Sequence, residues 1–332
     1  MITGQKQNDN DEGKMKNKRG FEFSFGWMFA LIIGAVILFL AIYATVKLIG
    51  TERDVQSTEV AKQLGILLIP AETGFGEGKS IPSIKFATET RVYNNCTLKG
   101  VFGEQLISVA TSSSLGKKWT APGIASNYPN KYIFSSSIIE GDEINVFSKP
   151  FNFPYKTGEL LFIWSNKEHF CLINPPSEIE KEIESLGLKN INFTQQITEC
   201  KEKSRKICFY SSLPECDVVV SSNDMSIRWK GGQTSFYDGS LIYGAIFSEP
   251  KLYECQVQRL MKRTSELAYI YLGKSSILSA RAGGCSQGLQ AYLSDYGKKT
   301  ANATSSYALR ENRFANEELK RMNDGLQACK LW

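Results

Sequence analysis

An uncharged apolar run from Phe25 to Val46 is the strongest pattern in the chain, and no second run of this kind exists. At about 1.5 Å of rise per residue, a helix of this length spans the roughly 30 Å hydrocarbon core of a bilayer. A basic cluster of Lys14, Lys16, Lys18 and Arg19 precedes it, and basic residues beside a membrane helix are retained in the cytoplasm. The pattern predicts a single-pass protein of the cell membrane, with a cytoplasmic N-terminus and an extracytoplasmic C-terminal region.

A cleaved secretory signal is the alternative to this anchor. The apolar core of such a signal is usually about 7–15 residues long and ends at a small-x-small site. The run here is longer, and Ala41-Ile-Tyr-Ala44 matches the cleavage pattern poorly. We therefore expect an uncleaved anchor that has the lipid bilayer as its first partner.

Short β-branched and aromatic runs separated by turn residues follow between residues 84 and 174, a pattern typical of strands. Glu140-Gly-Asp-Glu143 lies between two of these runs, and we expect it to form a hairpin connection. The predicted strands are Ser83–Thr88, Glu104–Ala110, Lys131–Ile139, Ile144–Ser148, Glu159–Trp164 and Phe170–Ile173.

Helical and strand patterns alternate between residues 175 and 250. Ile179, Ile183 and Leu186 recur at helical spacing, and Ser177 with Glu180 forms a capping box. Glycine-containing turns separate the later runs, which indicates a meander. The strands predicted here are Lys189–Phe193, Asp217–Ser221, Ser226–Lys230, Gln233–Tyr237 and Leu241–Phe247.

Beyond Pro250 the apolar positions follow helical periodicity to the end of the chain. The first stripe begins at Tyr253 and predicts a long helix that ends near Gly273. A shorter helix follows around Leu293, and a third stripe runs from Ala315 to Cys329. These three helices predict a C-terminal helical layer.

The cysteines support an extracytoplasmic location independently of the apolar run. All eight follow the predicted membrane helix, and an even number on one side favours up to four disulfides in an oxidising compartment. A zinc site requires closer pairs, whereas the tightest spacing here leaves seven intervening residues. Cys208 is expected to pair with Cys200 or Cys216. The candidates are Cys96, Cys171, Cys200, Cys208, Cys216, Cys255, Cys285 and Cys329.

The fold class predicted from these patterns is α+β. An N-terminal transmembrane helix precedes a disulfide-stapled ectodomain with an antiparallel β-rich front and a helical C-terminal layer. The predicted segments are a cytoplasmic tail (1–19), a transmembrane anchor (20–48), a juxtamembrane stalk and loop (49–83), a β-rich region (84–174), an α+β region (175–250) and a helical C-terminal region (251–332).

Composition indicates a folded globule outside the membrane, because 42% of residues are hydrophobic and 11% are aromatic. The net charge of +5 is modest, and no basic stripe is interleaved with aromatic residues, so nucleic acid is not an expected partner. The acceptor triplets that start at Asn95, Asn192 and Asn302 permit glycosylation.

Enzymatic chemistry has few candidate residues. His169 is the only histidine, and no Gly-x-Ser-x-Gly motif accompanies it, so nucleophilic catalysis and histidine metal sites lack their usual partners. Carboxylate pairs remain, because a glycosidase needs only two acids about 5–10 Å apart. We interpret the clustered acids as solvated turn residues and assign no catalytic, cofactor-binding or metal-binding residue. These acids are Glu140, Asp142, Glu143, Asp224 and Asp238.

Two fragments imitate phosphate-binding loops, Ala268–Ser275 and Gly74–Ser80. The first continues a predicted helix, whereas a phosphate loop must leave a strand and open a helix. The second lacks the first glycine and is followed by Pro82, which prevents a normal helix. Nucleotide is therefore not expected as a partner or cofactor.

Five aromatic residues in predicted loops have two interpretations. Exposed aromatic side chains with polar neighbours often mark contact sites for proteins or sugars. The alternative, which we favour, is a role in the core. These residues are Trp119, Tyr128, Phe151, Phe153 and Tyr155.

Lys18-Arg19-Gly20, followed by Phe21 and an apolar helix, resembles the leader of type IV pilin-like proteins. The resemblance covers about 30 residues, at 17–46, and implies cleavage after Gly20 and lateral packing of the apolar helix with others like it. The sequence departs from the family pattern in two places, since the expected acidic residue at the fifth position after the cut is Phe25, while Glu22 stands at the second.

Three functions follow, in this order of preference. The first is a membrane-anchored surface protein with a structural or binding role, whose partners are other membrane or surface proteins, a glycan, or a second copy. The second is the pilin-like subunit. The third is an extracytoplasmic hydrolase that uses carboxylates, which requires two acids to converge in a pocket.

Overall fold

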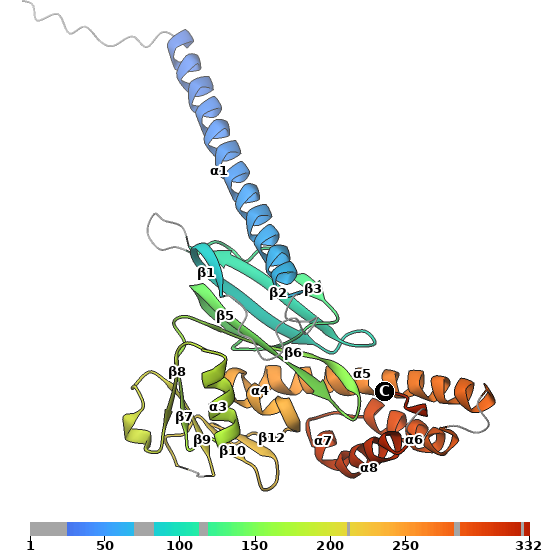
Figure 1. Ribbon diagram of the computed structural model, residues 1–332. Helices are drawn as coiled ribbons and strands as arrows, with labels where there is room; N and C mark the ends of the chain where they lie inside the picture. The colour runs from blue at the N-terminus through green and yellow to red at the C-terminus, as the bar shows by residue number, and fades with distance from the viewer. Residues whose placement is uncertain (1–24, 70–82, 113–118, 211–212, 282–285, 327–328) are drawn as a thin grey trace, which may run out of the picture. The chain divides into compact units, whose positions relative to one another are not determined.

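The structure is a computed structural model (Figure 1) that describes residues 25–69, 83–112, 119–210, 213–281, 286–326 and 329–332. The predicted tail, Gly20, Phe21 and the loop at 74–80 lie outside the described residues. The chain divides into two compact units, residues 1–51 and 52–332.

The first unit contains the start of helix α1, Phe25–Leu67. Its Phe25–Leu48 portion is long and apolar enough to cross a membrane, and none of it is buried. The predicted apolar helix is thus confirmed over the described residues, and its crossing of a bilayer stays a prediction. A core helix of a soluble domain would be mostly covered, because its apolar face is what folding buries.

The second unit opens with a six-stranded sheet in the order β3-β2-β1-β5-β6-β4. All neighbouring strands in it are antiparallel except β4 and β6, which are parallel. The strands are β1 (Ile84–Thr97), β2 (Glu104–Thr111), β3 (Ser126–Tyr128), β4 (Tyr132–Phe134), β5 (Ile138–Asn152) and β6 (Lys156–Ser165).

The hairpin predicted at Glu140–Glu143 is wrong, because these residues lie inside the long strand β5 and pair with β1 across a bulge. Gly141 favoured a turn in the sequence, but in the structure it allows Asn166 to lie close to the strand backbone. A Cβ built on it would lie 2.5 Å from Asn166 Oδ1. A glycine within a strand commonly marks such an approach.

The end of α1 packs on this first sheet as part of the second unit. Ala61, Leu64 and Leu68 are buried in a cluster with β1, β2, β5 and β6 side chains, including Val92 and Val109. Part of the predicted juxtamembrane stalk, at Ala61, Leu64 and Leu68, therefore contributes to the core of the folded domain.

The second sheet follows the order β12-β11-β10-β9-β7-β8. Strands β8, β7, β9 and β10 are mutually parallel, and β10, β11 and β12 are antiparallel. The elements are β7 (Phe170–Ile173), α3 (Ser177–Ser185), β8 (Ile191–Thr194), η1 (Ile197–Glu199), β9 (Arg205–Phe209), β10 (Val218–Ser221), β11 (Ser226–Trp229) and β12 (Thr234–Phe236). The first three runs of the predicted meander are confirmed as β10–β12, whereas a wholly antiparallel front is not observed.

The strand predicted at Leu241–Phe247 is wrong. This segment forms η2 (Gly239–Leu241) and α4 (Ile242–Phe247). Tyr243 to Phe247 are all buried, so the run shows no amphipathic period, and a short apolar run of this kind does not distinguish strand from helix.

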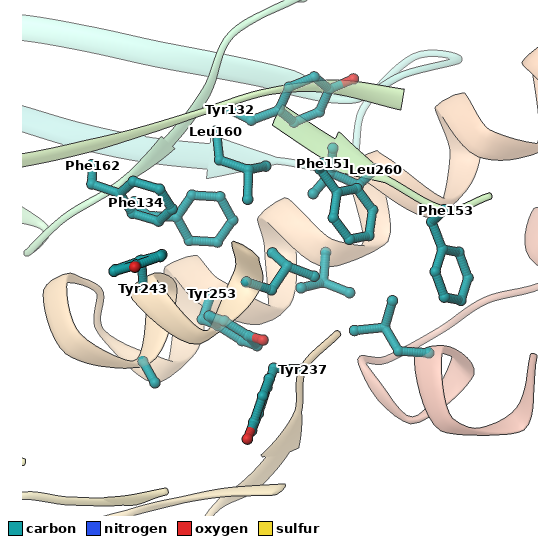
Figure 2. Close-up of a cluster of buried hydrophobic side chains, with 14 of the residues drawn as sticks. Tyr132, Phe134, Phe151, Phe153, Leu160, Phe162, Tyr237, Tyr243, Tyr253 and Leu260 are labelled. Carbon is teal, nitrogen blue, oxygen red and sulfur yellow. The ribbon is translucent and has the colours of Figure 1, made fainter. Parts of the chain in front are cut away.

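The predicted helical C-terminal layer is confirmed. It consists of α5 (Pro250–Arg281), η3 (Gln287–Leu289), α6 (Gln290–Ala301), α7 (Tyr307–Glu311) and α8 (Arg313–Asp324). Helix α5 continues past Gly273 and contacts β4 and β6. Between them lies an aromatic core (Figure 2), in which the ring centroids of Phe134 on β4 and Tyr253 on α5 are 5.8 Å apart. The mixed α+β class is therefore correct.

Candidate functional site

Three disulfides join cysteines of the described chain. Cys96 pairs with Cys255, Cys171 with Cys200, and Cys208 with Cys216. Of the two partners expected for Cys208, the structure selects Cys216. Cys329 is also disulfide-bonded, and Cys285 lies outside the described residues. The cysteines are therefore structural, and the described chain contains no free thiol.

All three predicted glycosylation acceptors are exposed. Asn95 lies on β1, Asn192 on the edge strand β8, and Asn302 at the C-terminal end of α6. Asn95 Oδ1 accepts a hydrogen bond from the Cys96 amide at 2.9 Å.

The acids of β5 have individual partners. Glu140 forms an ion pair with Arg91 at 2.7 Å, Glu143 pairs with Lys189 at 3.1 Å, and Asp142 accepts a hydrogen bond from Asn166 Nδ2 at 2.7 Å. Hydrogen bonds from Ser83 and Lys189 lower the pKa of Glu143. Each of these carboxylates thus has its own partner, as in ordinary ion pairs and hydrogen bonds at a protein surface.

Asp224 and Asp238 line a common cavity of about 20 Å³. Burial raises the pKa of Asp238, whereas hydrogen bonds from Ser221 and Ser226 lower that of Asp224. Opposed shifts are typical of acid and base pairs, but a cavity of this volume holds about one water molecule. It has no room for a sugar ring.

His169 precedes β7 and is half-buried, with its carbonyl oxygen accepting a hydrogen bond from the Arg205 amide at 2.8 Å. No group of three histidine, cysteine or carboxylate residues that could hold a metal ion occurs among the residues placed by the structure.

The core interpretation of the loop aromatics is confirmed for Phe151, Phe153 and Tyr155, which are fully buried. Tyr128 is half-buried and donates a hydrogen bond to the Ala61 carbonyl oxygen at 2.8 Å. Trp119 is half-buried under the Arg91 guanidinium, 4.0 Å from its ring centroid. Both have partners within the fold and form no exposed aromatic contact surface.

A polar pocket that the sequence analysis did not identify lies where β4, β6 and α5 meet. Its volume is about 280 Å³, and apart from Gly158 every lining residue has a polar side chain. We call it the Arg263 pocket. It is lined by Asn130, Tyr132, Lys156, Thr157, Gly158, Glu159 and Arg263.

The backbone explains how these residues meet. Strands β4 and β6 run in parallel, with Tyr132 opposite Leu160, so the start of β6 lies beside the start of β4. A Cβ on Gly158 would lie 3.0 Å from Tyr132 Cε2, so the glycine lets the tyrosine ring rest on the β6 backbone. Helix α5 supplies Arg263 from the opposite side.

Three polar atoms of the lining residues are buried without a hydrogen-bond partner in the described chain, the Tyr132 hydroxyl oxygen, Glu159 Oε1 and Arg263 Nε. Tyr132 is only 1% exposed, and Figure 2 shows its hydroxyl directed away from the other labelled side chains. An unpaired buried polar group costs about 1–3 kcal/mol. Such groups are rare in native structures and require an explanation.

The pocket is positively charged. Lys156 forms an ion pair with Glu159, while Arg263 forms no ion pair with any carboxylate in the described part of the chain. Burial raises the pKa of Tyr132, and the nearby Arg263 and Arg259 charges only partly oppose this. The hydroxyl therefore remains protonated at neutral pH and lies next to Arg263, whose proximity partly offsets the rise in its pKa.

One helical turn earlier, Arg259 is fully buried and fully paired. Its guanidinium donates to the carbonyl oxygens of Lys131 and Pro129, each at 2.8 Å, to that of Phe102 at 3.2 Å, and to Gln256 Oε1 at 2.8 Å. It also lies 4.9 Å from the Tyr132 ring centroid. This arginine has a structural role.

A larger cavity of about 550 Å³ lies among α6, α7 and α8 and includes Asn302, Tyr307 and Asn312. None of its lining residues has a buried polar atom without a partner. Asn312, its most buried polar residue, donates from Nδ2 to the Ala308 carbonyl oxygen at 2.9 Å. The Arg263 pocket is therefore the stronger candidate for recognition, since of the two cavities it alone is lined by buried polar atoms without a partner.

Comparisons with known proteins identify no relative, since no family model, no curated protein and no solved structure matches this chain.

Proposed function

We propose that this chain is a membrane-anchored extracytoplasmic protein whose disulfide-bonded domain has a binding role. The observation that carries the proposal is the exposed apolar surface of Phe25–Leu48. Burying one large apolar side chain stabilises by about 1.5–3 kcal/mol, so a run of this length represents on the order of tens of kcal/mol. A lipid bilayer removes that surface from water without any protein partner.

The disulfides support the orientation. Such bonds persist in oxidising compartments and are rare in the cytosol, and all three described bonds lie beyond α1. Together with the basic residues before the apolar run, they favour a cytoplasmic N-terminus and an external domain.

Labelling of intact cells with a membrane-impermeant, amine-reactive biotin reagent tests this orientation. We expect modification of exposed lysines such as Lys181, Lys201 and Lys320 in intact cells, and of Lys14, Lys16 and Lys18 only after lysis. The opposite pattern contradicts the proposal. Recovery of the protein in the soluble fraction after carbonate extraction also contradicts it, since a cleaved secretory signal would produce that result.

The pilin-like subunit is the second candidate, because an apolar helix with no covered face also suits lateral packing against identical helices. Intact mass of protein extracted from its own membranes separates the two. An unprocessed N-terminus favours the anchored protein, whereas loss of residues 1–20 and recovery in filaments favours the pilin-like subunit. The hydrolase is the least supported, since the candidate acids Glu140, Asp142 and Glu143 have partners at the surface and Asp224 and Asp238 line a cavity too small for a sugar.

A further inference from the structure

The Arg263 pocket contains donors that the fold leaves unused, and they belong to groups of different chemistry. The Tyr132 hydroxyl is neutral and buried, Arg263 Nε is part of a cation, and both lack partners within the residues that the structure covers. Lys156, whose side chain is about half exposed, adds a second positive charge, which is paired with Glu159. The Tyr132 hydroxyl, Arg263 and Lys156 can donate to an acidic group, while Glu159 Oε1 is an acceptor without a hydrogen-bond partner at the same pocket and can accept from a hydroxyl. A ligand that carries an acidic group beside a hydroxyl group therefore matches the lining.

From this arrangement we infer that the Arg263 pocket binds an oxyanion, a carboxylate, sulfate or phosphate group of an extracytoplasmic ligand. A guanidinium matches such groups because its planar donors form two parallel, charge-assisted hydrogen bonds to two oxygens. The inference rests on the proposed binding role and specifies its ligand chemistry.

Glu159 limits what can bind. Its side chain is largely buried and pairs with Lys156 at the pocket edge, so a second negative charge on the ligand would be repelled at that end. A neutral hydroxyl group can instead donate to the carboxylate. The volume of about 280 Å³ lies just below the range typical of ligand pockets, so the pocket fits one small acidic group with its nearest neighbours.

The contrast with Arg259 excludes the interpretation of Arg263 as a packing residue. Arg259 lies four residues earlier on α5, and every nitrogen of its guanidinium donates to an acceptor in the fold. If Arg263 only supported the fold, an acceptor for its buried Nε would be expected too, since the cost of leaving one unpaired is large.

Isothermal titration calorimetry on the full chain in detergent micelles tests the inference, with sodium sulfate, sodium glucuronate and neutral glucose as probes at constant ionic strength. Sulfate and glucuronate should bind the wild type, and glucose should not. Glucuronate binding at least about tenfold tighter than sulfate identifies an acidic sugar as the source of the anion, because the added hydroxyls then contribute. Equal affinity identifies a free anion.

Two variants locate the binding. Arg263→Gln should weaken anion binding by about tenfold or more, because it removes the charge from the hydrogen bonds. Tyr132→Phe should weaken it several-fold without lowering the melting temperature, since the hydroxyl has no partner in the fold. The matched control is Arg281→Gln, which removes the same charge from an exposed position on the same helix and should bind as the wild type does.

The inference is overturned if none of the anions binds the correctly disulfide-bonded wild type, or if Arg263→Gln and Arg281→Gln bind equally well. Either result leaves the membrane orientation untouched, because cell labelling measures that separately. Conversely, a reversed orientation with intact anion binding rejects the proposed location and retains the site.

Discussion

Two regions one turn apart on helix α5 differ in how many hydrogen-bond acceptors surround their arginine. Around Arg259, backbone carbonyl oxygens and the side chain of Gln256 surround the guanidinium, and Gln256 Nε2 donates in turn to the Ile133 carbonyl oxygen at 3.0 Å. Around Arg263, the buried Nε meets no acceptor, and the neighbouring Tyr132 hydroxyl is equally unpaired. The two regions share the Tyr132 ring.

The difference shows how the same residue type on the same helix is used for two purposes. Burying a charge without partners costs several kcal/mol, and the Arg259 region offsets that cost internally. Burial lowers the pKa of Arg259 to about 10, so the side chain stays charged at neutral pH and holds β4, its preceding loop and α5 together. The Arg263 region keeps its donors for an external acceptor, at some cost to the stability of the empty fold.

The largest loss of stability is expected on removing the Cys96–Cys255 disulfide, which holds the Arg259 region in place. Cys255 lies one turn before Arg259, and its partner Cys96 lies opposite Gln105 in the β1–β2 register. The bond spans 159 residues, and the chain-entropy model gives about 5 kcal/mol for such a loop. Chemical denaturation of Cys96→Ser/Cys255→Ser should show a loss of that order.

The matched control is Cys208→Ser/Cys216→Ser, whose bond spans 8 residues, for which the same model gives about 2.5 kcal/mol. Equal losses for the two double variants would show that loop length does not govern their stabilisation, and the Arg259 region would then depend less on this link than we infer.

A loss of about 4 kcal/mol is expected for Arg259→Met, which keeps the length of the side chain but leaves the carbonyl oxygens of Phe102, Pro129 and Lys131 without their donor. Arg263→Met should cost less than about 1 kcal/mol, because the buried Nε that it removes has no acceptor in the described fold. Guanidinium unfolding followed by circular dichroism measures both. Similar losses would contradict the distinction between the two regions.

Many of the helices and strands around the Arg263 pocket could be predicted from the sequence, but the pocket itself could not. The apolar stripe of α5 has a clear helical period, and the strands that later form β2, β6 and β7 show β-branched patterning. The prediction of a hairpin at Glu140–Glu143 was wrong because Gly141 lies inside a strand, where it allows Asn166 to approach closely. The prediction of a strand at Leu241–Phe247 was wrong because a buried run has no period that distinguishes strand from helix.

The Arg263 pocket joins Tyr132, the segment 156–159 and Arg263, which are distant in sequence and follow no common motif. Only the parallel pairing of β4 with β6 and the packing of α5 against them bring these residues together. In the sequence, Arg259 and Arg263 both look like basic residues on a helix. What separates them is the number of acceptors within reach, which is a property of the tertiary structure.

An intermediate loss of stability is expected for a substitution at Gly158, beside the Tyr132 ring that the two regions share. A side chain at Gly158 would press on the Tyr132 ring from 3.0 Å, so Gly158→Ala should cost about 1–2 kcal/mol through overpacking and should also weaken anion binding. Thermal unfolding and sulfate titration of this variant measure the two effects. Gly273→Ala, where no atom lies within 4 Å of the added Cβ, is the control and should not lose stability. Unchanged binding by Gly158→Ala would show that Tyr132 can shift without affecting the site.

The smallest effect is the most informative. Tyr132→Phe removes a hydroxyl whose oxygen is buried without a partner, so the empty protein should be unchanged or more stable by up to about 1 kcal/mol. Tyr253→Phe is the contrasting variant, because the Tyr253 hydroxyl donates to the Phe236 carbonyl oxygen at 2.8 Å, and its removal should cost about 1 kcal/mol. At a saturating anion concentration, the order of stability should reverse, because the anion stabilises the wild type more than it stabilises Tyr132→Phe. A Tyr132→Phe loss as large as that of Tyr253→Phe, without anion, would show that the hydroxyl has a partner in the fold, and the unpaired donor on which the comparison depends would not exist.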